Sequence, residues 1–219
     1  MRNIFRYERK FIINNFTIPS LENLLRNSKF KFKKNYAERK VNSIYFDNGN
    51  FDSFFENIDG KNFKNKFRLR WYGDKNVISS PTLEIKKKVS YNNSKVFYKI
   101  KNFKKIKLSK KNIEQILNKL RKKYNFLSNK SPISSTHYNR LYFISSKNNV
   151  RATIDYNINY NNYLNYSKQN NYSKSIILEI KYSNKKDDII RRNLENISFR
   201  INKNSKYINS LVEYPYLVT

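Results

Sequence analysis

Hydrophobic and charged residues alternate with a period of two along several stretches of this chain. In the clearest stretch, Phe67–Gly73, Phe, Leu and Trp occupy alternate positions, and Arg68 and Arg70 stand between them. Because successive side chains of a β-strand point to opposite faces, this pattern predicts a strand with one apolar and one cationic face. No acid within the stretch neutralises the two guanidinium groups.

Charged residues keep the same phase in four further predicted strands. These in-phase sets are Glu8 and Lys10; Glu84, Lys86 and Lys88; Arg151, Thr153 and Asp155; and Glu179 and Lys181. Cations dominate the charged faces, and the positions between them are mostly apolar. We interpret the repeated phase as one curled sheet whose charged faces are turned toward each other.

The alternating stretches, the turn residues and the helical periodicities together predict about eight strands with helices between them. Strands are expected over residues 6–13, 41–47, 67–73, 82–89, 95–101, 138–145, 150–156 and 175–183, and helices over 21–27, 51–58, 110–124 and 187–199. Ser20 and Ser109 are the expected N-caps of the first and third helices. Residues 29–40 are expected as a basic connection, and 157–174 as a long mobile loop or a ragged strand and turn.

The element pattern sets the fold class. The chain has no internal repeat, and its length suits one domain over residues 1–219. We therefore expect an α+β fold built on a closed antiparallel β-barrel of about eight strands, with peripheral helices.

Composition limits the possible chemistry. With 3 Gly, the chain has neither of the common Gly-rich phosphate-binding motifs. It contains 0 Cys, which excludes disulfides and thiolate metal sites and fits a reducing compartment. It also lacks a run of roughly 18 apolar residues and an apolar segment after Met1, which predicts a soluble, cytoplasmic protein.

The formal net charge of +30 indicates an anionic partner: a phosphate chain, a nucleic acid or an acidic membrane surface. A general abundance of Lys and Asn in the sequence is an alternative explanation for many surface lysines. It does not explain why charged residues stay in phase on strand faces.

A barrel of eight strands leaves an interior wide enough for one small ligand. The cations expected to line it are Lys10, Arg68, Arg70, Lys86, Arg140 and Arg151. At ~4 Å, two like charges repel by about 4 kcal/mol at an effective dielectric near 20, so such a lining needs water, acids or a polyanion. Each Arg pair or Glu–Lys pair taken alone is typical of a surface salt-bridge ladder. Their coincidence on five strands favours a site that binds phosphate groups with cations and holds a divalent metal with carboxylates.

The same positions carry a family resemblance in order along the chain. The matching segments are Tyr7–Lys10, Val41–Asp47, Arg68–Gly73, Leu83–Lys86, Tyr138–Arg140, Val150–Asp155, Leu178–Lys181 and Ser205–Tyr207. Together they resemble the VTC domain, the polyphosphate polymerase domain of the CYTH or triphosphate tunnel metalloenzyme superfamily. The motif RLRWYG after a YFD strand is specific to this resemblance.

The resemblance implies a closed antiparallel tunnel that binds ATP and Mn²⁺ or Mg²⁺ and extends inorganic polyphosphate with release of ADP. The six lining cations match the phosphate-binding positions. Lys95, Lys181, Lys203, Ser205 and Lys206 match further phosphate-binding positions, the last three within a segment that closes the tunnel. Glu179 matches the metal-binding carboxylate, with Glu8 and Glu84 as additional metal candidates.

Some features depart from the family pattern. The opening motif is reduced to Glu8-Arg9-Lys10, which leaves fewer carboxylates for a metal. No membrane helix is expected in this chain. If membrane partners in the family carry the product across a membrane, a separate protein would have to do so here. A tunnel triphosphatase, a non-catalytic polyphosphate-binding module and a nucleic-acid-binding protein remain as alternatives, with specific nucleic-acid recognition not expected.

Overall fold

The computed structural model describes residues 6–89, 92–145, 150–163, 170–194 and 199–211. These residues form two compact units, which are described separately. Unit 1 draws on residues 1–39, 138–158 and 173–204, and unit 2 on residues 40–137, 159–172 and 205–219. The long strands β2 (Phe32–Asp47), β8 (Ser131–Ser145) and β9 (Arg151–Asn162) contribute residues to both units.

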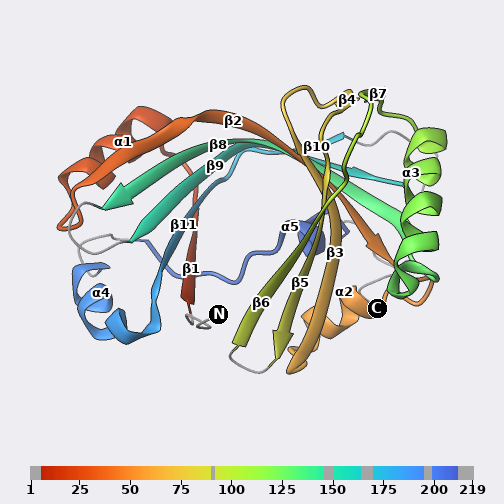
Figure 1. Ribbon diagram of the computed structural model, residues 1–219. Coiled ribbons are helices and arrows are strands. Elements are labelled where there is room, and N and C mark those ends of the chain that lie inside the picture. The colour runs from red at the N-terminus through yellow and green to blue at the C-terminus, as the bar shows by residue number, and fades with distance from the viewer. Residues whose placement is uncertain (1–5, 90–91, 146–149, 164–169, 195–198, 212–219) are drawn as a thin grey trace. The chain divides into compact units, whose positions relative to one another are not determined.

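Unit 1 combines a sheet with two helices (Figure 1). Besides parts of β2, β8 and β9, its elements are β1 (Arg6–Ile13), α1 (Ile18–Asn27), β11 (Ile176–Ser183), the 3-10 turn Asn184–Lys186 and α4 (Asp187–Leu194). The apolar faces of β1 and β11 form the core, and α1 and α4 bury their own apolar residues against it. Burial of these apolar side chains is the main favourable term for such packing.

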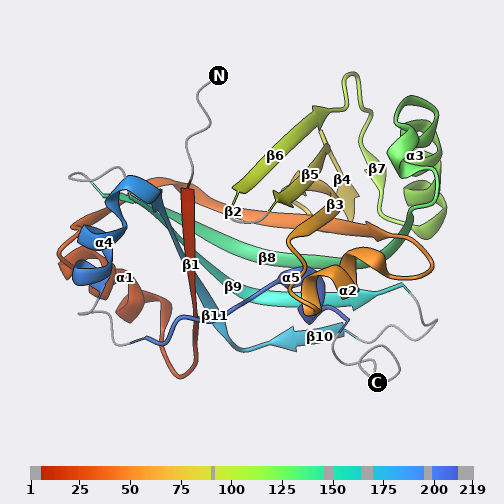
Figure 2. The ribbon, with the colours of Figure 1, turned by 90° about the horizontal axis from the view of Figure 1, so that it is seen from below.

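Unit 2 combines a second set of strands with three helices (Figure 2). Its further elements are α2 (Asp52–Ile58), β3 (Phe63–Tyr72), β4 (Val77–Ile78), β5 (Thr82–Val89), β6 (Asn92–Lys99), β7 (Ile106–Lys107), α3 (Lys110–Lys123), the 3-10 turn Asn125–Leu127, most of β10 (Asn170–Ser173) and α5 (Lys206–Asn209). Ser109 caps α3 as expected, and the buried stripe of that helix packs on the apolar face of β3 and β5. This support fixes the strands whose other face is charged.

A buried carboxylate at the end of β2 connects α2 and α5. Asp47 accepts hydrogen bonds from the backbone N–H groups of Ser53 and Phe54 at 3.1 Å each. The Tyr207 hydroxyl of α5 donates to Asp47 Oδ2 at 2.6 Å, and its ring meets Phe54 of α2 edge-on. Asp47 is fully buried, so these bonds replace the water that a carboxylate requires.

Among the described residues, the hydrogen-bonded strand order is β1-β11-β9-β8-β2-β3-β5-β6, with β10 on β9, in a mostly antiparallel sheet of nine strands. Together with the five α-helices of the described residues, this confirms the expected α+β class. The ladders of the described residues do not join β1 to β6. Closure of the sheet into a barrel is therefore not confirmed.

The element boundaries confirm some expectations and correct others. Strand 82–89 and the helix from Lys110 are confirmed, whereas the N-cap of α1 is Thr17 and not Ser20. The expected basic connection 29–40 mostly belongs to β2. β9 and β10 occupy much of the expected loop 157–174, of which 164–169 lie outside the described residues.

His137 lies in the interior of unit 2, between polar and aromatic neighbours. Its Nδ1 is 2.9 Å from Asn42 Oδ1, and its Nε2 is 3.3 Å from Ser135 Oγ. The ring also meets Trp71 edge-on. Burial, assisted by the charge of Lys75, lowers the pKa of His137 to about 4. The imidazole is therefore neutral at pH 7.

This environment predicts a pH-dependent stability. Below about pH 6.5, His137 binds a proton in the unfolded chain but stays neutral in the folded chain. The free energy of unfolding therefore falls as the pH drops toward about 4. The loss should reach up to about 3 kcal/mol, measured by urea unfolding between pH 7 and 4. His137→Gln should flatten this part of the profile. An unchanged profile in the variant would contradict a buried neutral imidazole.

Candidate functional site

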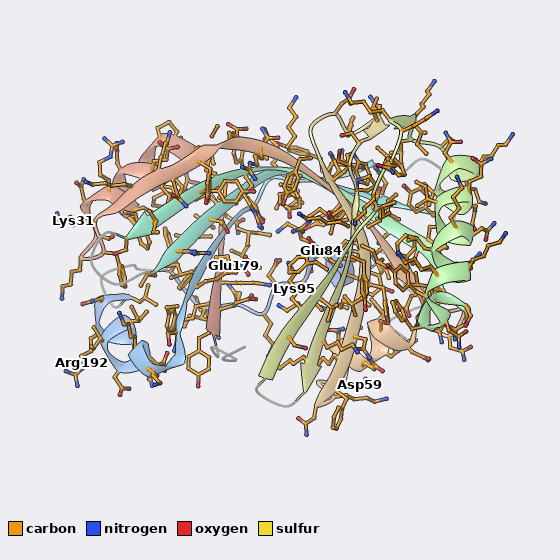
Figure 3. All side chains as sticks on the ribbon, viewed as in Figure 1. Lys31, Asp59, Glu84, Lys95, Glu179 and Arg192 are labelled. Carbon is orange, nitrogen blue, oxygen red and sulfur yellow. The ribbon has the colours of Figure 1, made fainter. Side chains whose placement is uncertain are left out.

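Two groups of charged side chains gather on strand faces, one in each unit. We call Arg68, Arg70, Glu84 and Lys95 of unit 2 the Glu84 cluster, and Lys10, Arg140, Asp155, Glu179 and Lys181 of unit 1 the Glu179 cluster. Glu84, Lys95 and Glu179 are labelled in Figure 3. Each cluster was predicted in part from the alternation of the sequence.

The register of unit 2 aligns the cluster residues in rows across the sheet. One row consists of Lys66, Lys86 and Lys95, the next of Arg68, Glu84 and Phe97, and the one after that of Ser43, Arg70, Thr82 and Lys99. Residues that are opposite each other in register point to the same face of a sheet. The cationic face expected from the sequence is therefore real, and it extends over β3, β5 and β6.

Glu84 is the centre of its cluster. Its Oε2 lies 2.5 Å from Arg68 Nη2 and 3.2 Å from Lys95 Nζ, and its Oε1 lies 3.7 Å from Arg70 Nη1. The carboxylate and Arg70 are buried, whereas 36% of the Lys95 side chain is exposed. Three cations thus share a single carboxylate.

These contacts shift the pKa values of both ends of the cluster. Burial alone would raise the pKa of Glu84, but Arg68, Arg70 and Lys95 together lower it to about 2. Burial and the neighbouring Arg68 lower the pKa of Lys95 to about 7, against the opposing effect of Glu84. Burial first, and the neighbouring positive charge second, thus weaken proton binding at Lys95.

The row of lysines next to this cluster reaches the segment before α5. Lys66 Nζ donates a hydrogen bond to Ser205 Oγ at 2.9 Å, and Ser205 caps α5 by accepting from Ile208 N. The following Tyr207 is held by Asp47. Ser205, one of the three residues predicted to close the site, therefore contacts the lysine row of β3.

The Glu179 cluster is built on β1, β11, β9 and β8. In register, Glu179 stands between Lys10 of β1 and Thr153 of β9. Its Oε2 lies 3.0 Å from Lys181 Nζ and 4.0 Å from Arg140 Nη2, and its Oε1 lies 3.9 Å from Lys10 Nζ. Burial alone would raise the pKa of Glu179, but these three cations hold it well below its usual range.

Asp155 gives the cluster a second carboxylate. Arg140 binds it through two parallel hydrogen bonds, Nε to Oδ1 at 2.5 Å and Nη2 to Oδ2 at 2.7 Å. Burial disfavours the charged guanidinium, but Asp155 raises the pKa of Arg140 well above its ordinary value. A bidentate pair of this kind fixes the plane of the guanidinium, so Arg140 is oriented before any ligand arrives.

The segment before α5 also contacts β1 in unit 1. Lys10 Nζ donates to the carbonyl oxygen of Asn204 at 2.8 Å, and Asn202 N donates to the Lys10 carbonyl at the same distance. Lys203, between these two residues, is exposed. This backbone pairing attaches the 202–204 segment to the strand that carries Lys10.

The remaining predicted site residues take less central places. Arg151 is exposed and stands opposite Lys181, which in turn stands opposite Glu8 on β1. Lys86 lies in the lysine row, part-buried. Lys66 lies one residue before the expected strand 67–73 and within β3, and its parity matches that of Arg68. Its even spacing from Arg68 and Arg70 was the available signal.

The donor set bears on metal binding. Among the residues that the structure describes, no three His, Cys, Asp or Glu side chains are grouped to hold an ion. A deprotonated carboxylate together with substrate phosphates is nevertheless the usual way in which proteins bind Mg²⁺. Glu179 fits that role better than Glu84. Its carboxylate is kept ionised, and Lys10 Nζ lies 3.9 Å from its Oε1, whereas Arg68 Nη2 lies only 2.5 Å from Glu84 Oε2.

Comparison with known families and structures identifies the chain. The sequence profile of the VTC domain matches residues 5–213, so the chain belongs to the VTC domain family. No curated protein sequence matches this chain. In the described residues, no helix combines the length and hydrophobicity needed to cross a membrane.

Solved structures share the fold at low sequence identity. A protein from Vibrio parahaemolyticus, proposed to be an adenylate cyclase, aligns with a TM-score of 0.57 and 11% identity, over 95% of this chain and 99% of its own. A protein from Bacillus halodurans with the same proposed activity aligns with a TM-score of 0.54 and 13% identity, over 96% of this chain and 98% of its own. A proposed adenylyl cyclase from Hippeastrum is described as having a dominant triphosphatase activity. It aligns with a TM-score of 0.52 and 10% identity, over 94% of this chain and 95% of its own.

The geometry of the Glu84 cluster predicts a large effect of removing its carboxylate. Glu84→Gln leaves Arg68, Arg70 and Lys95 without their shared counter-ion, which should destabilise the protein by about 3 kcal/mol. Inorganic tripolyphosphate supplies anionic oxygens, so it should raise the melting temperature more in the variant than in the parent protein. Thermal unfolding with and without the ligand measures both effects.

Glu114→Gln is the matched control, because Glu114 pairs with Arg121 at 3.6 Å on the outside of α3. This partly exposed pair should contribute about 1 kcal/mol or less, and its loss should not alter the response to tripolyphosphate. Equal ligand-induced shifts in Glu84→Gln and Glu114→Gln would show that the cations of the cluster do not bind phosphate.

Proposed function

We propose that this protein is a metal-dependent phosphotransferase that transfers the γ-phosphate of ATP to a growing inorganic polyphosphate chain. The observation that carries the proposal is the excess of cations over carboxylates on in-phase strand faces, in a chain that the VTC domain profile covers over 5–213. Such faces suit a ligand with negative charge distributed along a chain of phosphates.

The cations take different parts in this proposal. Arg68, Arg70, Lys86 and Arg151 hold the phosphate being transferred, while Lys10 and Arg140 hold the acceptor chain. The guanidinium groups bind two phosphate oxygens at once, which a lysine does not. Lys95, Lys181, Lys203, Ser205 and Lys206 complete the contacts to the phosphates. Phosphoryl transfer depends mainly on such positioning and on stabilisation of negative charge.

Carboxylates are assigned two roles. Glu179 would hold Mn²⁺ or Mg²⁺ against the phosphates, with Glu8 as a more exposed candidate on β1. The ion, when bound, would neutralise charge on the phosphate oxygens. Glu84 stays a candidate ligand, but its three cation contacts favour a part in orienting Arg68 and Arg70.

The reaction needs no nucleophilic side chain. An oxygen of the terminal phosphate of the acceptor attacks the γ-phosphorus of ATP, a new P–O bond forms, and the bond to the β-phosphate oxygen breaks to release ADP. The attacking oxygen is already anionic, so a general base is not required. The cations stabilise the charge that moves onto the departing ADP.

The proposal includes a closed antiparallel tunnel that binds the phosphate chain, as the family resemblance implies. It places the reaction in the cytoplasm, where ATP is available, and assigns any transport of the product across a membrane to a separate protein. These points are expectations of the proposed function.

A triphosphatase is the second candidate. The structure from Hippeastrum, described with a dominant triphosphatase activity, shares the fold over 95% of its own length at 10% identity. The same cations would then hold a triphosphate while water, instead of a phosphate chain, attacks the terminal phosphorus. The products distinguish the two reactions, because hydrolysis gives orthophosphate and polymerisation gives longer chains.

The polymerase reaction predicts a ladder of phosphate chains from ATP and Mn²⁺, resolved on a gel. Arg70→Ala removes the proposed bidentate contact of a buried guanidinium with the transferred phosphate, so it should lower the rate of chain synthesis at least roughly tenfold. Glu179→Gln should reduce the metal-dependent rate similarly. Arg192→Ala, on the exposed side of α4, is the control and should leave the ladder unchanged.

Orthophosphate without a ladder would contradict the polymerase and support the triphosphatase. Absence of both products, with binding of polyphosphate retained, would contradict an enzyme and leave a binding module. Loss of activity in Arg192→Ala as great as in Arg70→Ala would contradict the assignment of the site to the strand faces.

A further inference from the structure

An exposed aromatic side chain stands on the cationic face of unit 2. Phe97 lies on β6, directly opposite Glu84 of β5 in register, and 55% of the residue is exposed. Its neighbours on the same face of β6 are Lys95 and Lys99, whereas Val96 and Tyr98 belong to the opposite face. A ring in this position is surrounded by charges and does not belong to the apolar core behind the sheet.

The ring is connected to the Glu84 cluster through Lys95. The Lys95 ammonium lies 4.9 Å from the centroid of Phe97 and 3.2 Å from Glu84 Oε2. A cation over an aromatic face is attracted by the negative charge of the ring face. The contact therefore holds Phe97 next to the cations of the Glu84 cluster, while 55% of the residue stays exposed.

The spacing of the strands sets the distance between the ring and the arginines. Arg68, Glu84 and Phe97 are neighbours across three strands that lie about 4.8 Å apart, so the backbones at Arg68 and Phe97 are separated by roughly 10 Å. This distance is comparable to that between the terminal phosphate and the base of an extended nucleoside triphosphate. An aromatic platform at this distance suits the part of a nucleotide that is not phosphate.

We propose that Phe97 forms a subsite for the base of a nucleoside triphosphate, which stacks on the exposed ring while the phosphates contact Arg68, Arg70 and Lys95. This inference rests on the proposed function, because it names the residue that lets the same cations distinguish a nucleotide from an inorganic phosphate chain. Stacking requires only the flat face of a base, so the subsite accepts different bases.

The position of Phe97 distinguishes it from other exposed aromatic residues of these strands. Tyr72 shares the parity of Arg68 and Arg70, but it lies outside the row of Glu84. It is opposite Val41, four residues along the strand from Arg68. Phe63 is 68% exposed at the far end of β3, and its parity places it on the face of Phe67 and Leu69. Phe63 therefore provides a matched control for Phe97.

The test compares two ligands that share three phosphates and differ in the presence of a nucleoside. The dissociation constants of ATP and of inorganic tripolyphosphate are measured by calorimetry for the full chain and for Phe97→Ala, Phe97→Trp and Phe63→Ala. Loss of stacking in Phe97→Ala should weaken ATP binding by roughly five- to a hundredfold. Tripolyphosphate binding should change less than about twofold, and Phe97→Trp should retain ATP affinity.

The outcomes separate this inference from the proposed function. If the parent protein binds neither ligand, the proposed function fails and the subsite fails with it. If both ligands bind but Phe97→Ala weakens them equally or leaves both unchanged, only the subsite is overturned. An equal effect of Phe63→Ala on ATP binding also overturns it. If Phe97→Ala changes the oligomeric state and not the ratio of the two affinities, the exposed ring is a protein contact and not a base platform.

Discussion

The structure of each charged face depends on buried carboxylates that several cations share. Glu84 contacts Arg68, Arg70 and Lys95, and Glu179 contacts Lys10, Arg140 and Lys181. Without these carboxylates the like charges on neighbouring strands would repel each other in a poorly hydrated environment. Because the cations outnumber the carboxylates in each cluster, each face keeps an affinity for further anions.

The apolar faces of the same strands make this arrangement rigid. Trp71, Leu69 and Leu83 lie behind the Glu84 cluster and pack with α3, while Leu178 and Ile180 lie behind Glu179 in the core of unit 1. The period of two therefore performs two tasks at once: alternate residues form the core, and the residues between them form a face for phosphate. Long side chains attached to packed strands lose less freedom on binding than they would on a loop.

The sequence allowed the charged faces to be predicted because parity alone assigns a side chain to a face. The register confirms this, with Lys10 opposite Glu179 and Arg68 opposite Glu84. Parity does not reveal which residues of distant segments meet. The bond between Tyr207 and Asp47, and the bond between Lys66 and Ser205, join residues 160 and 139 positions apart.

Other features escaped prediction because local sequence contradicts their structure. The first half of β8 contains Pro132 and the buried polar residues Ser134, Ser135 and Thr136, so it lacks the apolar alternation of a strand. Residues 33–40 of β2 are exposed throughout, which removes the same signal. Their strand structure follows from pairing with neighbours that the local sequence does not specify.

The central claim is that the cation-rich strand faces bind phosphate chains. Calorimetric titration with polyphosphate of defined length, applied to the parent protein, Arg70→Ala, Arg140→Ala and the control Arg192→Ala, tests it most directly. We expect Arg70→Ala and Arg140→Ala each to weaken binding and Arg192→Ala to leave it unchanged. Equal affinities in all four proteins would contradict the account.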